Sequence, residues 1–222
     1  MNSSVKVISV AARGSLLSRA QVQEVLELLQ RFYKGVTFIP EWIETRGDKD
    51  QATSLLGLEK TDFFTKEVDE AVLDGRCQIA VHSAKDLPEE IAQELSVVAY
   101  TKGVDPSDVL VFRPGENLHT LSKTPRVGSS SLRRKENVLA FLPNCTFVDV
   151  RGPIEKRLEL VDGGELDALI LAKAALIRLR IQRESLVLPG EIAPMQGRLA
   201  VLAKKEDKEM RALFSLCHEP SS

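Results

Sequence analysis

Four short segments of this 222-residue chain gather the basic and hydroxyl side chains that bind anions. In each segment, arginine, lysine or serine follows an apolar, strand-like run and precedes a helical pattern. The segments are Arg13-Gly14-Ser15, His82-Ser83-Ala84-Lys85-Asp86, Ser129-Ser130-Ser131-Leu132-Arg133-Arg134, and Arg151-Gly152 with Arg157. Helix starts attract anions through free N–H groups, and the arginine fork fits carboxylates and phosphates. The four segments therefore predict a site for a polyanion.

Taken singly, most of these residues also have a structural interpretation. Serines suit helix caps, adjacent arginines suit a solvated helix face, a Lys-Asp pair suits a weak surface ion pair, and a histidine after a valine suits packing. The residues concerned are Ser15, Ser131, Arg133, Arg134, Lys85, Asp86 and His82. Arg157 has a structural interpretation too, as the ion-pair partner of Glu155 or Glu159. A shared site is favoured only because all of these segments lie where a predicted strand ends and a predicted helix begins.

Asp86 is the carboxylate that these basic segments contain. Lys85 beside it would keep it ionised, because a neighbouring cation lowers a carboxyl pKa. An ionised carboxylate in a partly dry site stabilises a developing cation and steers a proton. The alternative is a structural carboxylate that caps the turn at Leu87-Pro88, and residue type alone favours that alternative.

Strand-like and helix-like patterns alternate along the chain, which predicts an α/β fold. We expect mixed, mainly parallel sheets with helices on both faces. Gly35 and Gly75 are placed to end helices, Thr61 or Asp62 to cap one, and Pro153 to begin one. Strands are predicted over 5–11, 36–43, 78–81, 108–112, 146–150, 168–171 and 199–202. Helices are predicted over 22–32 and 64–72, from after Ser131 to Phe141, over 153–161, from after Leu171 to about Leu179, and over 205–217.

Two stretches rich in proline, glycine and polar residues mark the weakest joints, residues 101–106 and 188–197. They predict a central domain inserted into an outer one. The outer domain would comprise residues 1–101 and 199–222, and the inserted domain residues 102–198. Two α/β domains joined in this way form a hinged clamp with a cleft between them.

Composition narrows the function classes. The net charge of −2 argues against a nucleic-acid partner. No apolar run reaches the length of a membrane span, and the N-terminus lacks a signal pattern. Three scattered cysteines without metal spacing fit a reducing compartment and predict no metal site. We therefore expect a cytoplasmic monomer that binds a small molecule.

Read together, these segments resemble the hydroxymethylbilane synthase (porphobilinogen deaminase) family. The resemblance covers about residues 5–218, and its motifs fall in the expected order. They are Ala12-Arg13-Gly14-Ser15-Leu16-Leu17, Phe64-Thr65-Lys66-Glu67, Val81-His82-Ser83-Ala84-Lys85-Asp86-Leu87-Pro88, Gly128-Ser129-Ser130-Ser131-Leu132-Arg133-Arg134, Arg151-Gly152, Asp167-Ala168-Leu169-Ile170-Leu171-Ala172 and Gln196-Gly197.

The resemblance implies a clamp like that of periplasmic binding proteins, and a transferase of tetrapyrrole (heme) biosynthesis. Such an enzyme joins four porphobilinogen units head to tail and releases ammonia at each step. It implies that Asp86 is catalytic. Lys85, Ser130, Ser131, Arg133 and Arg134 would bind a dipyrromethane cofactor, and Arg13, Ser15, Phe64, Arg151, Arg157 and Gln196 would bind the substrate.

The chain also departs from the family pattern. The family's third domain carries the cofactor cysteine after two glycines, and the resemblance implies that this domain is missing here. None of Cys77, Cys145 and Cys217 has that context. The family's Arg-Gly-Asn is Arg151-Gly152-Pro153 here. Three hypotheses stay open: an enzyme with a primer held noncovalently or by another cysteine, a catalytically impaired pyrrole or polycarboxylate binder, and a fragment that needs the missing domain.

Overall fold

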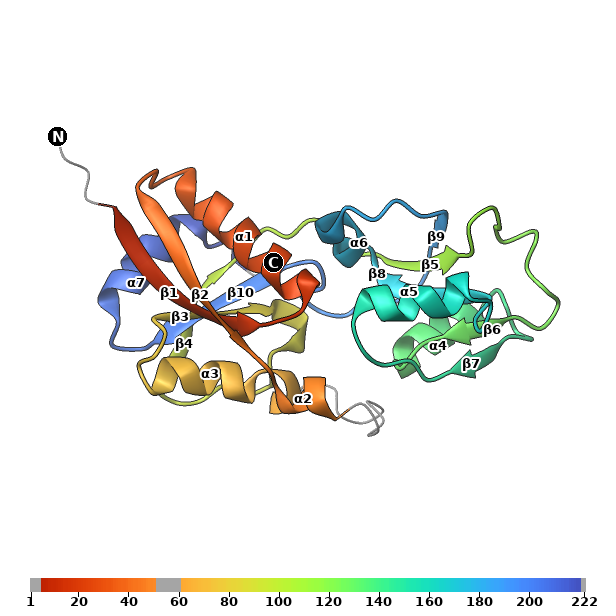
Figure 1. Ribbon diagram of the computed structural model, residues 1–222, viewed down its shortest axis with the longest axis horizontal. Helices are drawn as coiled ribbons and strands as arrows, with labels where there is room; N and C mark the ends of the chain where they lie inside the picture. Colours follow the sequence, from red (N-terminus) through yellow and green to blue (C-terminus); the bar gives the residue numbers. More distant parts are fainter. Residues whose placement is uncertain (1–4, 51–60, 221–222) are drawn as a thin grey trace. The chain divides into compact units, whose positions relative to one another are not determined.

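The computed structural model describes residues 5–50 and 61–220, which divide into two compact units (Figure 1). Residues 5–49, 61–104 and 198–220 belong to the first unit. Asp50 and residues 105–197 belong to the second unit. The chain thus leaves the first unit after Val104 and returns to it at Arg198, where the sequence predicted 101 and 199 as the last and first residues of the outer domain.

The first unit is built on a five-stranded mixed sheet with the order β2-β1-β3-β10-β4. β1 runs parallel to β2 and β3, whereas β10 runs antiparallel to β3 and β4. The strands are β1 (Lys6–Arg13), β2 (Val36–Ile43), β3 (Ile79–Ser83), β4 (Leu95–Tyr100) and β10 (Leu199–Lys204). The helices are α1 (Leu16–Gln30), α2 (Arg46–Lys49), α3 (Lys66–Leu73) and α7 (Lys208–Phe214).

Helices cover both faces of this sheet. Alternate residues of β1, among them Ile8 and Val10, join one apolar cluster with Val25 of α1 and Phe214 of α7. The helix α3 packs against β1, β3 and β10 and buries Val68 completely. Neighbouring residues of a strand point to opposite faces of the sheet, so β1 packs against α1 and α7 on one face and against α3 on the other.

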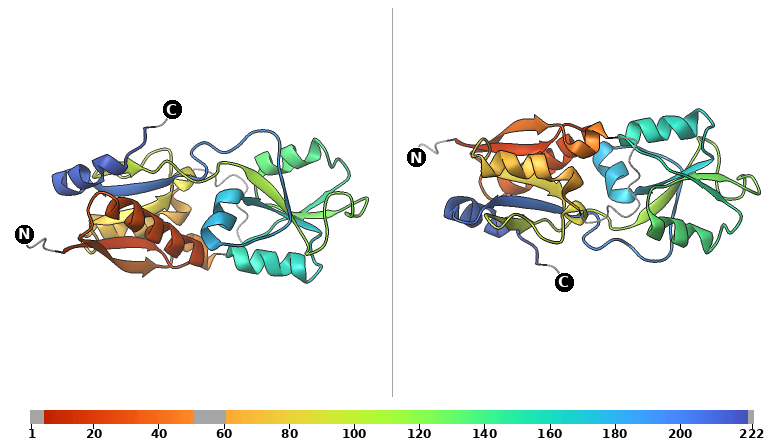
Figure 2. Two further views of the ribbon diagram at one scale, coloured as in Figure 1. Left: turned by 90° about the horizontal axis from the view of Figure 1, so that it is seen from above. Right: turned by 90° about the horizontal axis from the view of Figure 1, so that it is seen from below.

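The second unit repeats this plan on a sheet with the order β7-β6-β8-β5-β9. Figure 2 shows α4 and α5 on opposite faces of it, each over its own apolar cluster. The strands are β5 (Asp108–Phe112), β6 (Arg126–Gly128), β7 (Thr146–Val148), β8 (Ala168–Ala172) and β9 (Ser185–Val187), and the helices are α4 (Leu132–Leu139), α5 (Ile154–Asp162) and α6 (Lys173–Leu179).

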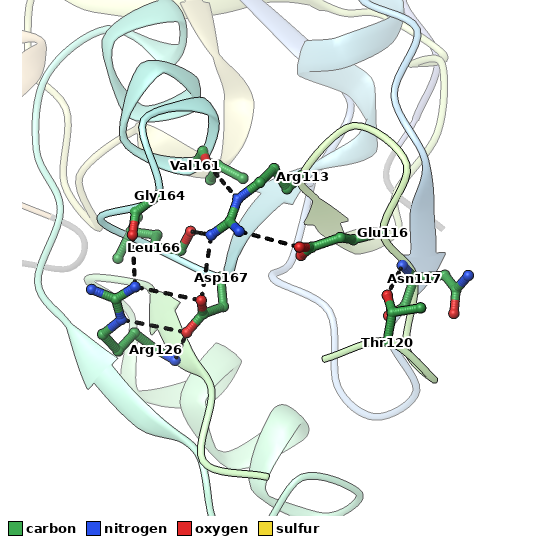
Figure 3. A network of polar contacts seen from close by, with 9 residues as sticks. All are labelled: Arg113, Glu116, Asn117, Thr120, Arg126, Val161, Gly164, Leu166 and Asp167. Carbon is green, nitrogen blue, oxygen red and sulfur yellow. Dashed lines mark hydrogen bonds and ion pairs between the residues drawn. The ribbon is translucent and has the colours of Figure 1, made fainter. Parts of the chain in front are cut away.

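Arginine side chains close the C-terminal end of α5 (Figure 3). Arg113 Nε donates to the Val161 carbonyl at 3.2 Å, and Arg126 Nη2 donates to the Gly164 carbonyl at 2.7 Å. Asp167 lies between the two guanidinium groups, 3.4 Å from a nitrogen of each. Cations are favourable at a helix C-terminus, and Asp167 balances part of their charge.

The predicted α/β fold with mixed sheets and helices on both faces is confirmed. In the described strands, antiparallel pairings are as frequent as parallel ones, because β10 and β5 each enter their sheet against its direction. Two helix boundaries were predicted wrongly. α1 ends at Gln30, well before Gly35, and α3 is preceded by Thr65 rather than by Thr61 or Asp62. Gly75 does follow α3 with a positive φ of 76°.

Candidate anion-binding site

In the first unit, two of the predicted segments lie at one edge of the sheet. β1 and β3 are parallel neighbours, so Arg13-Gly14-Ser15 and Ser83-Ala84-Lys85-Asp86 both follow strands that end there. Ser15 caps α1, since its hydroxyl accepts the Ser18 N–H at 3.2 Å. The Ser83 hydroxyl accepts a hydrogen bond from Gln21 of α1 at 2.8 Å. The structural interpretation of Ser15 is therefore confirmed, and its place at the edge still allows a ligand contact.

Arg13 is held in a defined position at this edge. Its Nε donates to Asp48 at 3.2 Å, a second nitrogen forms an ion pair with the same carboxylate, and its Cζ lies 4.6 Å from the centre of the Phe64 ring. Burial alone would raise the pKa of Asp48, but the hydrogen bonds and Coulomb attraction of Arg13, together with two hydrogen bonds from Thr45, outweigh it and lower the pKa. Gly47 makes room beneath Phe64. Arg13 and Phe64, each predicted separately to bind the substrate, thus lie in contact.

Asp86 ends a short 3-10 helix, Ala84–Asp86, directly after β3. It is half-buried, and no hydrogen bond or ion pair reaches its carboxylate from residues 5–50 or 61–220. The following turn closes through the backbone, because the Leu87 N–H donates to the Ala84 carbonyl at 3.4 Å. The alternative that Asp86 caps this turn therefore gains no support.

His82 precedes this segment and has a structural partner. Its ring is buried, and its Nε2 lies 2.9 Å from a carboxylate oxygen of Asp69 on α3. This arrangement matches the interpretation of His82 as a packed, hydrogen-bonded histidine.

In the second unit, β6 and β7 are parallel and end at one edge, where the serine run begins. The Ser130 hydroxyl donates to the Val150 carbonyl at 2.5 Å and accepts the Val150 N–H at 3.1 Å. Ser131 occupies the N-cap position of α4, but its hydroxyl makes no capping bond there. Ser130 thus joins two strand ends, and Ser131 keeps its hydroxyl for another partner.

Asp108 begins β5 at this same edge, opposite Ala172. Its side chain is 1% exposed and accepts hydrogen bonds from Arg133 at 2.8 Å, from Arg134 at 2.9 and 2.7 Å, and from Gln196 at 3.0 Å. Burial alone would raise the pKa of Asp108, but the two guanidinium groups outweigh it and lower the pKa. Three predicted ligand-binding residues therefore meet on one buried carboxylate.

Arg151 and Arg157 also lie where β7 leads into α5. Arg151 Nη2 donates to the Asp50 carbonyl at 3.0 Å, and Arg157 Nε donates to the Gly152 carbonyl at 2.7 Å. Gly152 has a positive φ of 90°, a conformation that favours glycine. Pro153 was predicted to be the first residue of this helix. It occupies the N-cap position instead, and α5 begins one residue later, at Ile154.

The three cysteines are poor candidates for a covalent attachment. Cys77 and Cys217 are buried, and burial raises the pKa of each, that of Cys217 to about 11. Burial also raises the pKa of Cys145. Because the thiolate is the reactive form, a raised pKa disfavours each of the three as a nucleophile. Among the described residues, no three His, Cys, Asp or Glu side chains are grouped to hold a metal ion, and no helix is long and apolar enough to cross a membrane.

Comparison with known proteins identifies the family. Residues 8–212 match the family model described as porphobilinogen deaminase, dipyromethane cofactor binding domain. The chain belongs to the porphobilinogen deaminase family. This family acts in tetrapyrrole biosynthesis on porphobilinogen, and the matched domain is the one that binds the dipyrromethane cofactor.

Relatives in this family come in more than one length. A probable porphobilinogen deaminase of Chlamydia pneumoniae is 40% identical over 97% of this chain and 92% of its own length. The probable porphobilinogen deaminase of Chlamydia trachomatis is 39% identical over 95% of this chain and 87% of its own length. The porphobilinogen deaminase of Thermus thermophilus is 36% identical over 98% of this chain but 72% of its own length.

Solved structures support the fold alone. A TRAP periplasmic solute binding protein from Desulfovibrio salexigens aligns with a TM-score of 0.52 at 14% identity, covering 97% of this chain and 73% of that chain. The LysR family transcriptional regulator CbnR aligns with a TM-score of 0.56 at 13% identity, covering 95% of this chain and 68% of that chain. The predicted two-domain fold of the periplasmic-binding-protein type is confirmed.

Three residues that position the site were not predicted from the sequence: Asp48, Asp108 and Gln21. Asp108 carried a usable signal, because an aspartate at the start of an otherwise apolar strand needs a partner when it is buried. Asp48 and Gln21 carried none, since their contacts span 35 and 62 residues.

Proposed function

We propose that this protein is a hydroxymethylbilane synthase that condenses four porphobilinogen units head to tail. In each step the C–N bond of the incoming unit's aminomethyl arm breaks, ammonia leaves, and a C–C bond forms to the free ring carbon of the pyrrole at the growing end, which loses its proton. The observation that carries the proposal is the unpartnered carboxylate of Asp86 among basic strand ends. It supports a role in stabilising the cation left by ammonia and in accepting the ring proton.

The donor groups at both edges fit the acidic arms of pyrroles. The cluster of Arg133 and Arg134 carries one positive charge more than Asp108 neutralises, and the Ser131 hydroxyl keeps its hydrogen-bonding capacity. Together with Lys85 and Ser130, these residues would hold the dipyrromethane cofactor. When bound, that cofactor supplies the free ring carbon at which the chain grows. Arg13, Ser15, Phe64, Arg151, Arg157 and Gln196 would contact the substrate.

A second candidate function is a pyrrole or polycarboxylate binder without turnover. The raised pKa values of Cys77, Cys145 and Cys217 favour it, because a primer that none of these three thiols anchors can diffuse away. The protein would act in the cytoplasm as a monomer and without nucleic acid.

The substitution Asp86→Asn tests the proposal. It keeps the shape of the side chain and removes its charge, so ammonia release from porphobilinogen should fall by about two orders of magnitude or more while binding changes little. The exposed Glu90 of the same segment offers a matched control, since Glu90→Gln removes an equal charge outside the site. Equal loss of binding and turnover in Asp86→Asn would assign that residue a structural role. Binding without turnover in the unaltered protein would leave the second function.

A further inference from the structure

We propose that Asp108 is a positioning residue, which fixes two arginines so that their excess positive charge binds a carboxylate of the ligand. The arginines are Arg133 and Arg134. This inference rests on the proposed function, because it assumes a ligand with carboxylate arms.

Asp108 fixes the arginines from several directions. Both of its oxygens are used, one by Arg133 and the other by two nitrogens of Arg134. A guanidinium group has five N–H donors, so each arginine keeps donors for a further partner. The side chains of Arg133 and Arg134 remain 21% and 14% exposed, against 1% for Asp108. A ligand can therefore reach the arginines but not the carboxylate behind them.

The carboxylate is itself held firmly. Gln196 Nε2 donates to Asp108 at 3.0 Å and to the Pro106 carbonyl at 2.7 Å. Arg133 also donates to the Glu191 carbonyl, which accepts a second bond from Asn137 at 2.7 Å. Such anchoring leaves little freedom in the two guanidinium groups, and pre-organised donors bind more tightly than mobile ones.

Charge balance points to a missing anion. Two guanidinium groups and one carboxylate leave the cluster with one positive charge in a half-buried place. For structure alone, a buried ion pair contributes little, and an extra cation adds a desolvation penalty. A ligand carboxylate would supply the second negative charge and accept the remaining N–H donors.

The same unit contains a counterpart without this surplus (Figure 3). Asp167 also lies between two arginines, Arg113 and Arg126, but Arg113 pairs in addition with Glu116 at 3.1 Å, so the charges cancel. Asp167 precedes β8, whereas Asp108 faces the last residue of β8, so the two clusters lie at opposite edges of the sheet. Asp167 therefore provides a matched control.

The experiment compares Asp108→Asn with Asp167→Asn in the full chain. Porphobilinogen carries the same acidic arms as the rings of the dipyrromethane cofactor, so it serves as the probe of the Arg133–Arg134 site, and its affinity is measured by calorimetry. Thermal unfolding is measured by circular dichroism. We expect both variants to unfold at lower temperature. Only Asp108→Asn should lose affinity, by about tenfold or more, since charge-assisted hydrogen bonds to the ligand are no longer pre-formed. Unchanged affinity in Asp108→Asn would overturn the inference. So would increased affinity, which would make Asp108 a competing anion.

A second measurement does not depend on the ligand. In ¹⁵N spectra, the Nε–H of Arg134, held 2.9 Å from Asp108, should exchange slowly with water and lose that protection in Asp108→Asn. Fast exchange in the unaltered protein would refute the positioning role even if porphobilinogen does not bind. If Asp108→Asn fails to fold, Arg134→Lys replaces it, because lysine keeps the charge and loses the fork. Full affinity in Arg134→Lys would also refute the inference. Absence of porphobilinogen binding in the unaltered protein, with slow exchange, would instead overturn the proposed function.

Discussion

Gly47 provides a sharp test of the Phe64 site, because its own lack of a side chain makes room for that ring. A Cβ added at Gly47 would overlap the Cδ1 and Cε1 carbons of Phe64 and lie 3.0 Å from Cδ1 of Phe63. Gly47 is buried, and its φ is not in the left-handed region, so Gly47→Ala introduces overlap without backbone strain.

The size of the effect follows from two opposing contributions. Overpacking a filled site costs about 1–3 kcal/mol. Alanine regains up to about 1 kcal/mol over glycine within a helix, here α2. We therefore expect Gly47→Ala to lower the free energy of unfolding by about 1–2 kcal/mol. Exposed Gly14, whose added Cβ would lie 3.9 Å from Trp42, is the control, and Gly14→Ala should change stability by less than about 0.5 kcal/mol.

A double-mutant cycle assigns the cost to the right ring. Unfolding in urea is followed by the fluorescence of Trp42, the only tryptophan of the chain, which lies on β2 of the same unit. In a Phe64→Ala background the overlap with that ring is gone and the 3.0 Å contact with Phe63 remains, so Gly47→Ala should cost much less than in the unaltered protein. An equal cost in both backgrounds would refute the packing of Phe64 on Gly47.

Two further predictions concern titrating groups. The pKa values of Asp108 and Asp167 are lowered in the folded protein, in both cases by arginines that outweigh burial. Their stabilising contributions are therefore present above the unfolded pKa of about 3.9 and are lost as pH falls through the lower folded values. Stability measured in urea from pH 6 downward should decline, and less steeply in Asp167→Asn; an unchanged slope would argue against that network. The three thiols, with raised pKa values, should react slowly with iodoacetamide at pH 7 until the chain is unfolded. Fast labelling of a folded cysteine, or a covalent pyrrole adduct by mass spectrometry, would reopen a thioether anchor.

Much of the fold could be predicted because hydrophobic periodicity is a local signal. The strand over 36–43, for example, was predicted with its observed bounds. Arg126–Gly128 was not predicted as a strand, since a strand of three residues gains its definition from its neighbours in the sheet. Leu95–Tyr100 was also missed, although it is as long as Leu199–Lys204, where a strand was predicted. The end of α1 was predicted wrongly because the helix gives way at Gln30 to turns closed on the Leu28 and Leu29 carbonyls, before the glycine at 35.

The candidate site was predictable in its residue types but not in its internal pairing. Serine and arginine at strand ends indicated an anion site, and the structure places them at two sheet edges. The internal pairing depends on contacts between segments that are distant in the sequence. Arg13 pairs with Asp48 in this way, and Arg133 and Arg134 share Asp108. These pairings change the interpretation of the arginines, from isolated cations to groups held by acidic partners.

The most direct test is a titration with porphobilinogen followed by backbone amide shifts. If basic strand ends bind the acidic arms, saturable shifts should appear at residues 13–15 and 85–86 in one unit and at 129–134 in the other, and they should weaken as salt rises. Shifts confined to the opposite edge around Asp167, or no shifts in either set, would contradict the account.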